Sequence, residues 1–313
     1  MKLYLLLPLA LTLSCNAVKT SNLPSRSDQL IKDVKVLSSD AYEGRKTGTK
    51  GAEMARNYIR KRFKEIGVKS FPLLNNYQQS FSFAGIDDPK IEGKNVVGYI
   101  QGTTDKIIVI SAHYDHLGII NGVIYNGADD NASGVAGILK IATHYARNKP
   151  NCTLVFVAFD AQEFGRKGSE YFVNNPPFDL KRIKLNLNLD MISHNEKGQL
   201  FAAGSFRYPQ LKNYLVTTIP DLKILFGHDN PKFATDDWTD QSDQSAFNAK
   251  KIPFIYFGVE DHKDYHKSTD KFESINQQFF INAANGILEI TDNFDKDRTI
   301  ESTFRDKLQS SKM

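Results

Sequence analysis

Side chains that bind divalent metals stand at the ends of two apolar segments of this sequence. The segment "KIIVISAHYDHLG" carries His113 and Asp115, and "TLVFVAFDAQEFG" carries Gln162 and Glu163. Imidazole and carboxylate groups are the protein ligands of zinc and of related transition metals. A single His or Asp at such a place is more often a turn, capping or hydrogen-bonding residue. The prediction of a metal site therefore depends on several of them occurring together.

Three more segments supply the same kinds of side chain. "NGADDNASG" contains Asp130, "NLDMIS" contains Asp190, and "DYHKSTD" contains His266. The first segment could instead be only a helix N-terminus, capped by Ser133 or by an Asp. In an open α/β sheet, however, ligands bind beyond the carboxyl ends of the strands, where side chains from distant segments converge.

Apolar and amphipathic segments alternate along the chain in the way this arrangement requires. "GAEMARNYIRKRFKEIGV" has a helical period, and Gly67 is placed to end that helix. "SGVAGILKIATHYARNK" predicts a second helix. Apolar, β-branched runs predict strands at 95–100, 106–115, 153–161, 183–193 and 251–258. The pattern predicts a three-layer α/β domain with a mostly parallel, twisted central sheet and helices on both faces.

The motifs together resemble those of the M28 family of zinc aminopeptidases. The resemblance rests on "SAHYDHLG", "NGADDNASG", "FDAQEFGRKGS", "NLDMIS" and "DYHKSTD", in this order. Residues 37–59 also resemble the segment that leads into that domain. The similarity covers residues 28–292 and implies a zinc exopeptidase-like fold.

The resemblance implies two zinc ions per chain and a role for each motif residue. The implied ligands are His113 and His266 on one metal each, Asp130 between the metals, and Glu163 and Asp190 on one metal each. Asp115 would hold the His113 imidazole and raise its basicity. His262 competes with His266, but only His266 stands in the "YHKSTD" context. The family also implies a cis peptide bond between Asp130 and Asn131.

One position departs from the family pattern. Active members carry a second Glu before the Glu ligand, where it acts as general base, and this chain has Gln162. An amide oxygen is too weakly basic to accept a proton at neutral pH, and general-base catalysis is typically worth about 10²–10⁴-fold. We therefore expect impaired peptide hydrolysis, unless Asp129 or Asp243 replaces the base or the substrate has a good leaving group.

Two further residues fall at positions that line the substrate pocket in relatives. These are Met191 and Tyr265, and a tyrosine at the latter position donates a hydrogen bond to the developing oxyanion in some relatives. Ordinary core packing is the alternative for both.

Three functions are compatible with these motifs. The first is a zinc aminopeptidase that removes N-terminal residues from peptides with a free N-terminus. The second is a non-catalytic homologue that binds zinc or peptide termini, for which Gln162 is the argument. The third is a transferase of the glutaminyl cyclase type, which has the same fold and one zinc. Metal stoichiometry and activity on aminoacyl anilides distinguish them.

The first fifteen residues, "MKLYLLLPLALTLSC", are typical of an export signal. Lys2 supplies the positive start, and the apolar run is shorter than the about 20 residues that span a bilayer. Cys15 resembles the lipidated cysteine of bacterial lipoproteins. This predicts a protein held at the bacterial cell envelope by an N-terminal lipid only, with ordinary secretion as the alternative.

Composition and the terminal segments complete the prediction. We expect a signal peptide at 1–15, a tether at 16–27, the peptidase-like domain at 28–292 and a charged tail at 293–313. The chain has 40 basic and 36 acidic residues without a basic stripe, so nucleic-acid binding is not predicted. Cys152 begins an apolar run and is interpreted as a core thiol. With Cys15 lipidated, no disulfide within the chain is possible.

Overall fold

The structure is a computed structural model, and it describes residues 26–85 and 88–297 of the 313-residue chain. The helices are α1 (Arg26–Leu37), α2 (Lys50–Ile66), α3 (Gly134–Tyr145), α4 (Lys167–Asn174), α5 (Gln244–Ala249) and α6 (Gln277–Lys296). The strands are β1 (Gln78–Phe83), β2 (Ile91–Ile100), β3 (Ile107–His113), β4 (Gly118–Ile120), β5 (Val123–Tyr125), β6 (Thr153–Phe159), β7 (Ile183–Leu189), β8 (Gln199–Ala203), β9 (Lys223–Leu225) and β10 (Phe254–Gly258).

Within the described residues, eight strands form one central sheet in the order β1-β2-β6-β3-β7-β10-β8-β9. The four middle strands, β6, β3, β7 and β10, run parallel to one another. The pairs β1–β2, β2–β6 and β10–β8 are antiparallel, and β8–β9 is parallel. The predicted α/β fold with a mostly parallel sheet is confirmed, and antiparallel pairs flank its parallel centre.

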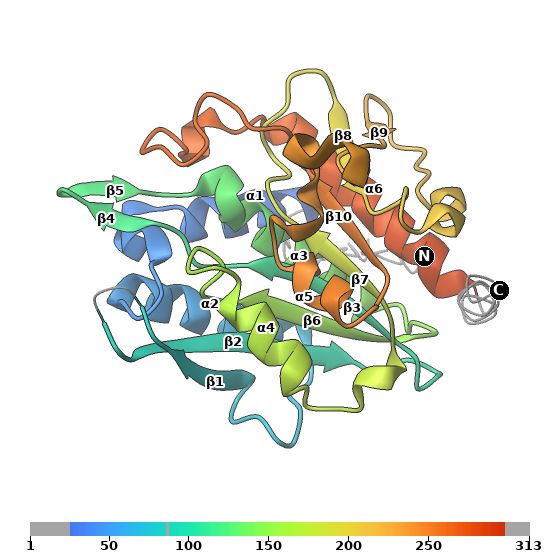
Figure 1. The fold of residues 1–313 in the computed structure, drawn as a ribbon, viewed down its shortest axis with the longest axis horizontal. Coiled ribbons are helices and arrows are strands. Elements are labelled where there is room, and N and C mark those ends of the chain that lie inside the picture. The colour runs from blue at the N-terminus through green and yellow to red at the C-terminus, as the bar shows by residue number, and fades with distance from the viewer. Residues whose placement is uncertain (1–25, 86–87, 298–313) are drawn as a thin grey trace, which may run out of the picture.

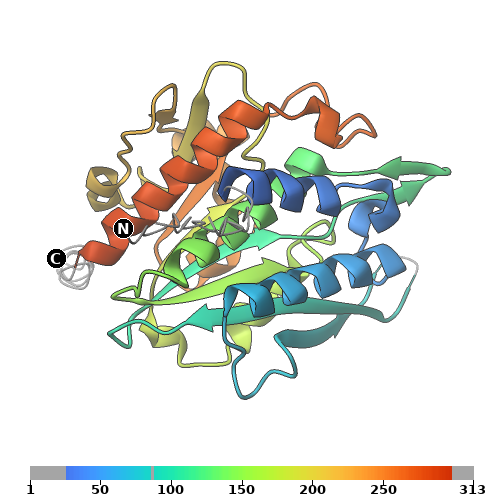
Figure 2. The ribbon, with the colours of Figure 1, turned by 180° about the vertical axis from the view of Figure 1, so that it is seen from behind.

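Helices cover both faces of this sheet and make the fold three-layered. α1, α2, α3 and α6 lie on the face turned to the viewer in Figure 2, and α4 and α5 lie on the face shown in Figure 1. β3 is buried at every position. Ile108 and Ile110 belong to the core on the first face, whereas Ile107 and Val109 pack with Phe172 of α4 on the second. A strand buried on both sides needs apolar residues throughout, which explains its sequence.

Helix α2 follows from local signals that the sequence displays. Thr49 caps its start by accepting a hydrogen bond from the Ala52 N–H, and Gly67 ends it in the left-handed conformation with φ of 90°. Ala55, Ile59 and Phe63 are fully buried on one face. The predicted helix and its end are therefore confirmed.

The predicted strands all lie in the central sheet, but several elements were not predicted. α1, α4, α5, α6, β1, β8 and β9 have no counterpart in the sequence analysis. β4 and β5 form a separate hairpin that projects from the body of the molecule (Figure 1). Strands of three residues are too short for a periodic pattern to reveal them.

The domain boundaries differ slightly from those expected. α1 begins at Arg26, so the last two residues of the predicted tether are helical. α6 continues to Lys296 with Phe294 fully buried, so the first four residues of the predicted tail belong to the domain. The predicted signal peptide and Cys15 lie outside the described residues. Among residues 26–85 and 88–297, no helix has the length and apolar character needed to cross a membrane.

Candidate metal centre

The carboxyl ends of the four parallel strands meet at one edge of the sheet and carry the predicted ligands (Figure 1). His113 is the last residue of β3, and Asp190 directly follows β7. Glu163 lies in the turn after β6, and His266 lies in the loop after β10. Asp130 lies in the helical turn that leads into α3. Segments far apart in the sequence thus bring five side chains to one place.

Three of these side chains form a first group. His113 Nε2 lies 3.3 Å from Asp130 Oδ1 and 3.2 Å from Asp190 Oδ1. All three residues are buried. One imidazole nitrogen and two carboxylate oxygens therefore point to a common position.

The other oxygen of Asp130 belongs to a second group. His266 Nε2 lies 3.1 Å from Asp130 Oδ2 and 3.5 Å from Glu163 Oε1. His116, which the sequence analysis did not include, lies with Nδ1 3.0 Å from Glu163 Oε1. Because its two oxygens face different groups, the Asp130 carboxylate has the geometry of a bridging ligand.

The spacing of these atoms fits a pair of zinc ions. Zinc bonds its nitrogen and oxygen ligands at about 2.0–2.2 Å, so atoms at neighbouring corners of a tetrahedral site lie roughly 3.3–3.5 Å apart. The imidazole-to-carboxylate distances of 3.1–3.5 Å for His113 and His266 match this spacing. The donor set of imidazole and carboxylate is also the one that zinc prefers.

The same side chains shift one another's pKa values. Burial would lower the pKa of His113, but Asp190 and other carboxylates outweigh it and raise that pKa well above the usual value. Hydrogen bonds to Asp130 and Glu163 raise the pKa of His266 to about 10. For Asp130, burial is outweighed by the nearby imidazoles, which hold its pKa well below the usual value. A divalent cation would take the place of the protons that these imidazoles hold.

Asp115 organises the turn that carries Glu163. Its carboxylate is fully buried and accepts hydrogen bonds from the N–H groups of Gln162, at 3.0 Å, and of Glu163, at 3.1 Å. His113 Nδ1 lies 3.7 Å from Asp115 Oδ1 and closer, at 3.1 Å, to the Asp115 backbone oxygen. Asp115 therefore touches both the first imidazole and the turn of the second group, and its shortest hydrogen bonds come from the turn, with a longer one of 3.4 Å from the Thr47 hydroxyl.

Arg45 stabilises the backbone around the centre, a role that the sequence did not predict. Its guanidinium is buried and donates hydrogen bonds to the backbone oxygens of Leu37, Tyr114, Asn126 and Gly127. It thereby joins the segment after β3 to the turn before α3. Burial lowers its pKa to about 10, and nearby carboxylates oppose the shift. Its only sequence signal was its place inside the segment 37–59.

Asp270 holds the turn that presents Asp130. Its carboxylate accepts hydrogen bonds from the N–H groups of Asp129, at 2.9 Å, and Asp130, at 3.0 Å. The peptide bond between Asp130 and Asn131 is cis, as the resemblance implied. Asp270 is the last residue of the "DYHKSTD" motif, and this position was the sequence feature that could have indicated a role at the site.

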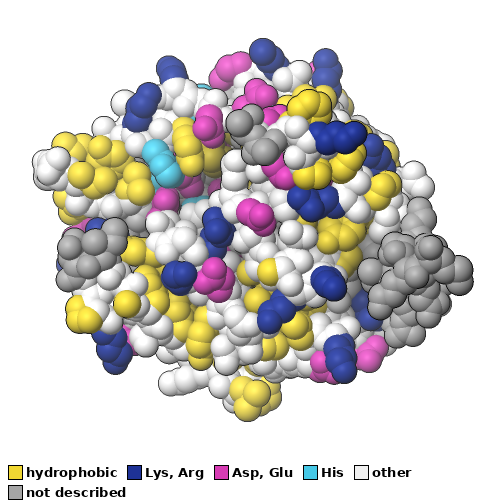
Figure 3. Space-filling model, viewed as in Figure 1, with side chains coloured by type: hydrophobic (Ala, Val, Ile, Leu, Met, Phe, Trp, Pro, Cys, Tyr) yellow, Lys and Arg dark blue, Asp and Glu magenta, His cyan; other side chains and the backbone are white. Residues whose placement is uncertain are grey.

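A cavity of about 250 Å³ opens beside the two groups. Gln162, Met191 and Tyr265 line it, as do the five predicted ligands, whereas His116 does not. Its wall also includes Gly165, Trp238, Gln241, Ser242, Tyr256, Val259 and Asp261. On this face of the molecule, a histidine reaches the surface beside acidic side chains (Figure 3). A small ligand could therefore reach the metal positions from solvent.

The two carboxylates considered as replacement bases do not line this cavity. Asp129 is fully buried, and its oxygens accept hydrogen bonds from Ser193 and from His262 Nε2. Asp243 is also fully buried, and burial raises its pKa to about 7. Asp261 is the remaining carboxylate of the cavity wall that belongs to neither metal group.

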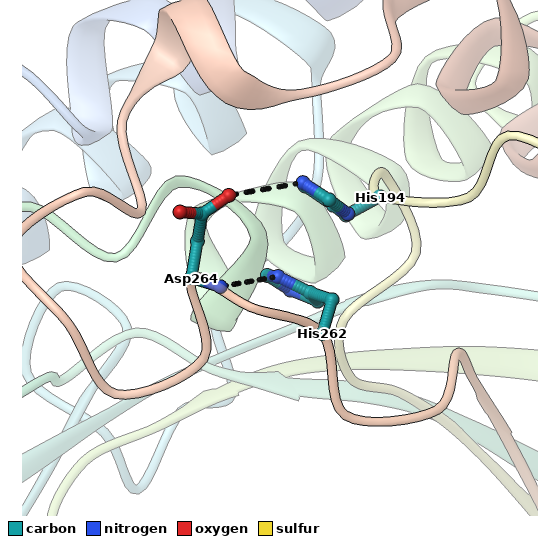
Figure 4. Close-up of side chains that lie close together, drawn as sticks. All are labelled: His194, His262 and Asp264. Atoms are coloured by element: carbon teal, nitrogen blue, oxygen red, sulfur yellow. Dashed lines mark hydrogen bonds and ion pairs between the residues drawn. The ribbon is translucent and has the colours of Figure 1, made fainter.

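A third cluster, formed by His194, His262 and Asp264, does not fit a metal in its present arrangement. His194 Nε2 lies 3.3 Å from Asp264 Oδ2, and His262 lies next to both (Figure 4). The two imidazole rings are stacked, with centroids 3.8 Å apart and planes inclined by 9°. The in-plane lone pairs of stacked rings lie in two separate, nearly parallel planes, so they cannot converge on one metal. His262 instead donates to Asp129, which explains why His266 and not His262 reaches the metal groups.

Comparison with known proteins identifies the family. The family described as "Peptidase family M28" matches residues 95–291, which include every ligand candidate of both groups. The chain belongs to this peptidase family. Membership in family M28 agrees with the order of the motifs and with the zinc exopeptidase-like fold.

The chain spans less than half the length of each of three curated relatives that it matches. The chain is 33% identical over 130 residues to a vacuolar membrane protease of Eremothecium gossypii, covering 40% of this chain and 12% of the relative. It is 25% identical over 170 residues to the alkaline phosphatase isozyme conversion protein of Escherichia coli K12, covering 50% and 49%. It is 29% identical over 214 residues to leucine aminopeptidase 2 of Trichophyton rubrum, covering 60% and 42%.

Solved structures share the fold. A leucine aminopeptidase precursor from Bacteroides thetaiotaomicron matches with a TM-score of 0.68 and 18% identity, over 84% of this chain and 96% of the other. A glutaminyl cyclase from the same organism matches with a TM-score of 0.66 and 19% identity, over 84% and 96%. The peptidase and the cyclase thus fit about equally well, so the fold alone does not separate these two activities.

Proposed function

We propose that this M28 protein is a di-zinc aminopeptidase that removes N-terminal residues from peptides. The observation that carries the proposal is the Asp130 carboxylate, whose Oδ1 faces His113 and whose Oδ2 faces His266. A one-metal site would not need two imidazole groups on opposite oxygens of one buried carboxylate. The name of the Trichophyton rubrum relative, leucine aminopeptidase 2, agrees with this assignment.

The chain's own residues would hold and balance two divalent cations. The three negative charges of Asp130, Glu163 and Asp190 would offset three of the four positive charges of the cations. The histidines would bind in their neutral form. When bound, the zinc ions would supply Lewis acidity, which polarises a carbonyl and makes water a better nucleophile. The buried position of the carboxylates would keep solvent from screening these charges.

The cavity wall suits a peptide with an apolar first residue. Met191, Trp238 and Val259 supply apolar surface in a cavity of about 250 Å³, which has room for an apolar side chain. Burial and the nearby carboxylates raise the pKa of Tyr265, so its phenol stays protonated and able to donate a hydrogen bond. We assign Tyr265 the role of donor to the negative charge that develops on the attacked carbonyl.

Gln162 would limit the rate of this reaction. It lines the cavity, and its Nε2 donates to the backbone oxygen of Gln241 at 3.3 Å. An amide can orient water but cannot take its proton, so the general-base contribution is missing. Asp129 and Asp243 do not line the cavity, which leaves Asp261 as the carboxylate to test as a substitute.

The central experiment combines zinc content with turnover of Leu-, Ala- and Arg-anilides by the protein without residues 1–15. We expect two zinc ions per chain, a preference for Leu, and a gain of about 10²–10⁴-fold in kcat for Gln162→Glu. The matched control is Gln241→Glu, which adds a carboxylate to the same cavity and should give no comparable gain. Should Gln162→Glu bring no gain, Asp261→Asn would show whether Asp261 already acts as the base.

A transferase of the glutaminyl cyclase type is the second candidate, favoured by the solved cyclase of similar fold. It predicts one zinc per chain and conversion of peptides that begin with glutamine. The first group, His113 with Asp130 and Asp190, argues for a second metal. Absence of turnover on both substrate classes, with zinc bound, would favour a non-catalytic binding protein.

We also propose that the protein is exported and held at a bacterial envelope by a lipid on Cys15. The support is the sequence of residues 1–15 alone. Expression of the full chain with Cys15→Ser should move it from the membrane fraction to the soluble exported fraction. An unchanged distribution would exclude the lipid anchor.

A further inference from the structure

His116 occupies the second metal group without a role among the five implied ligands. It stands three residues after His113 and its side chain is fully buried. Its Nδ1 lies 3.0 Å from Glu163 Oε1 and 3.6 Å from Asp130 Oδ2. The two polar atoms that Nδ1 faces are therefore both carboxylate oxygens of the metal centre.

His116 Nδ1, Asp130 Oδ2 and Glu163 Oε1 lie close enough together to hold one metal ion, and His266 Nε2 faces the same two oxygens. Glu163 Oε1 and Asp130 Oδ2 each lie near two imidazole nitrogens, His116 Nδ1 and His266 Nε2. The four nitrogen-to-oxygen distances are 3.0, 3.1, 3.5 and 3.6 Å. They scatter around the roughly 3.3 Å edge expected for a tetrahedral zinc site.

The surroundings of His116 fix its ring in this direction. A Cβ atom added to Gly127 would lie 2.6 Å from both Cγ and Cδ2 of His116, so the backbone of Gly127 packs directly on the ring. The backbone N–H of His116 donates a hydrogen bond to the backbone oxygen of Arg45 at 3.4 Å. On the far side of the ring, Nε2 is buried and has no hydrogen-bond partner among the described residues. The ring's polar contacts therefore lie on the side of the metal group.

We propose that His116 Nδ1 is a fourth protein ligand of the metal position formed by Asp130, Glu163 and His266. This inference rests on the proposed di-zinc function. With His116 included, one metal position has four protein ligands, whereas the position formed by His113, Asp130 and Asp190 has three. Sites with four protein ligands are typically closed and tightly bound, whereas sites with three keep a position open for water or substrate. The His116 position would hold its zinc more tightly, and the His113 position would be the open one.

The first test measures zinc retention. Dialysis of the wild-type protein against a graded chelator series should remove one zinc first and the second only at much higher chelator strength. His116→Asn keeps a hydrogen-bond donor near Glu163 but removes the imidazole. It should weaken the tighter site by more than about 100-fold, since loss of a group that only orients a ligand costs about 10–100-fold. His144→Asn, at the end of α3, is the matched control and should retain zinc as the wild type does.

A second measurement uses the unaltered sequence, so it does not depend on a variant that folds. In the ¹¹³Cd-substituted protein with ¹⁵N-labelled histidine, three histidines should show coupling to cadmium. Coupling from only two histidines would overturn the proposal, as would wild-type zinc retention by a folded His116→Asn variant. If the wild type binds fewer than two metals, the di-zinc function itself fails. That outcome is distinguishable from two bound metals with two coupled histidines.

Discussion

Single carboxylates in this molecule differ in function because of the atoms that surround them. Asp130 faces imidazoles through both oxygens, while its neighbour Asp129 is occupied by Ser193 and His262. The Asp115 carboxylate accepts hydrogen bonds from two backbone N–H groups and from the Thr47 hydroxyl. Residue type alone therefore predicts chemistry only when the partners of each oxygen are known.

Asp115→Ala should weaken both the fold and metal binding. It leaves the partly buried N–H groups of Gln162 and Glu163 without an acceptor, at about 1–3 kcal/mol each. We expect a loss of roughly 2–5 kcal/mol in the free energy of unfolding and about 10–100-fold weaker zinc binding. Denaturant unfolding and zinc titration measure the two effects. Asp179→Ala removes an exposed capping carboxylate and should cost only about 1 kcal/mol.

Tyr265→Phe separates a catalytic phenol from a packing residue. Tyr265 lines the cavity and stacks on His266, with ring centroids 4.1 Å apart. Loss of a donor to a developing negative charge should lower kcat by about 10²–10³-fold and leave KM nearly unchanged. The measurement is best made in the faster Gln162→Glu background. An unchanged kcat would assign Tyr265 to packing alone.

At the scale of elements, the centre depends on turns that are tied together from outside it. Arg45 joins the end of α1, the segment after β3 and the turn before α3 through four backbone oxygens. Asp270, after β10, holds the backbone of that same turn. The strands place the ligand candidates near one another, and these buried side chains set their final positions.

Arg45→Met should therefore loosen the centre at a distance. The variant keeps much of the side-chain volume but leaves buried backbone oxygens without a donor, which costs about 1–3 kcal/mol for each unsatisfied group. We expect at least about 3 kcal/mol of lost stability together with weaker zinc binding. Thermal unfolding with and without zinc measures both. Arg147→Met, at an exposed position after α3, should change neither.

Cys152 is expected to be chemically inert in the folded protein. Burial raises the pKa of its thiol to about 11, and Asp295 of α6 adds to the shift. At pH 8 only about a thousandth of the thiol is ionised, and the thiolate is the reactive form. The protein without residues 1–15 should not react with a disulfide reagent until it is unfolded in denaturant. Rapid reaction of the native protein would contradict this packing.

At the scale of the whole molecule, three layers bury a set of like charges at one edge of the sheet. Asp130, Glu163 and Asp190 lie within or beside one cavity, and all three are largely buried. Metal ions are the natural counter-charge for such a cluster. Metal binding and folding should therefore be coupled.

Removal of metal should lower thermal stability. Zinc at a thousand times its dissociation constant stabilises a protein by about 4 kcal/mol, which for a domain of this size corresponds to roughly 10 °C in Tm. A chelator should cause this decrease, and added zinc should reverse it. The control is magnesium, which prefers oxygen ligands and should not restore Tm. A Tm unchanged by chelation of a zinc-loaded protein would contradict the coupling.

The sequence by itself determined the kind of chemistry and the strands that carry it. His113, Glu163 and Asp190 follow apolar runs that are buried on both faces, and such runs form parallel strands whose ends meet. Gln162 was recognisable as a substitution because it lies beside Glu163 in a motif.

Only the tertiary structure decided which atoms meet. The assignment of one Asp130 oxygen to each histidine, the entry of His116 into the second group and the support from Arg45 all depend on side-chain directions and on turns. Side-chain directions and turn conformations have no periodic signal in the sequence. The antiparallel pairs β1–β2, β2–β6 and β10–β8 and the short strands β8 and β9 were likewise invisible, because their pairing depends on contacts between distant segments and not on local pattern.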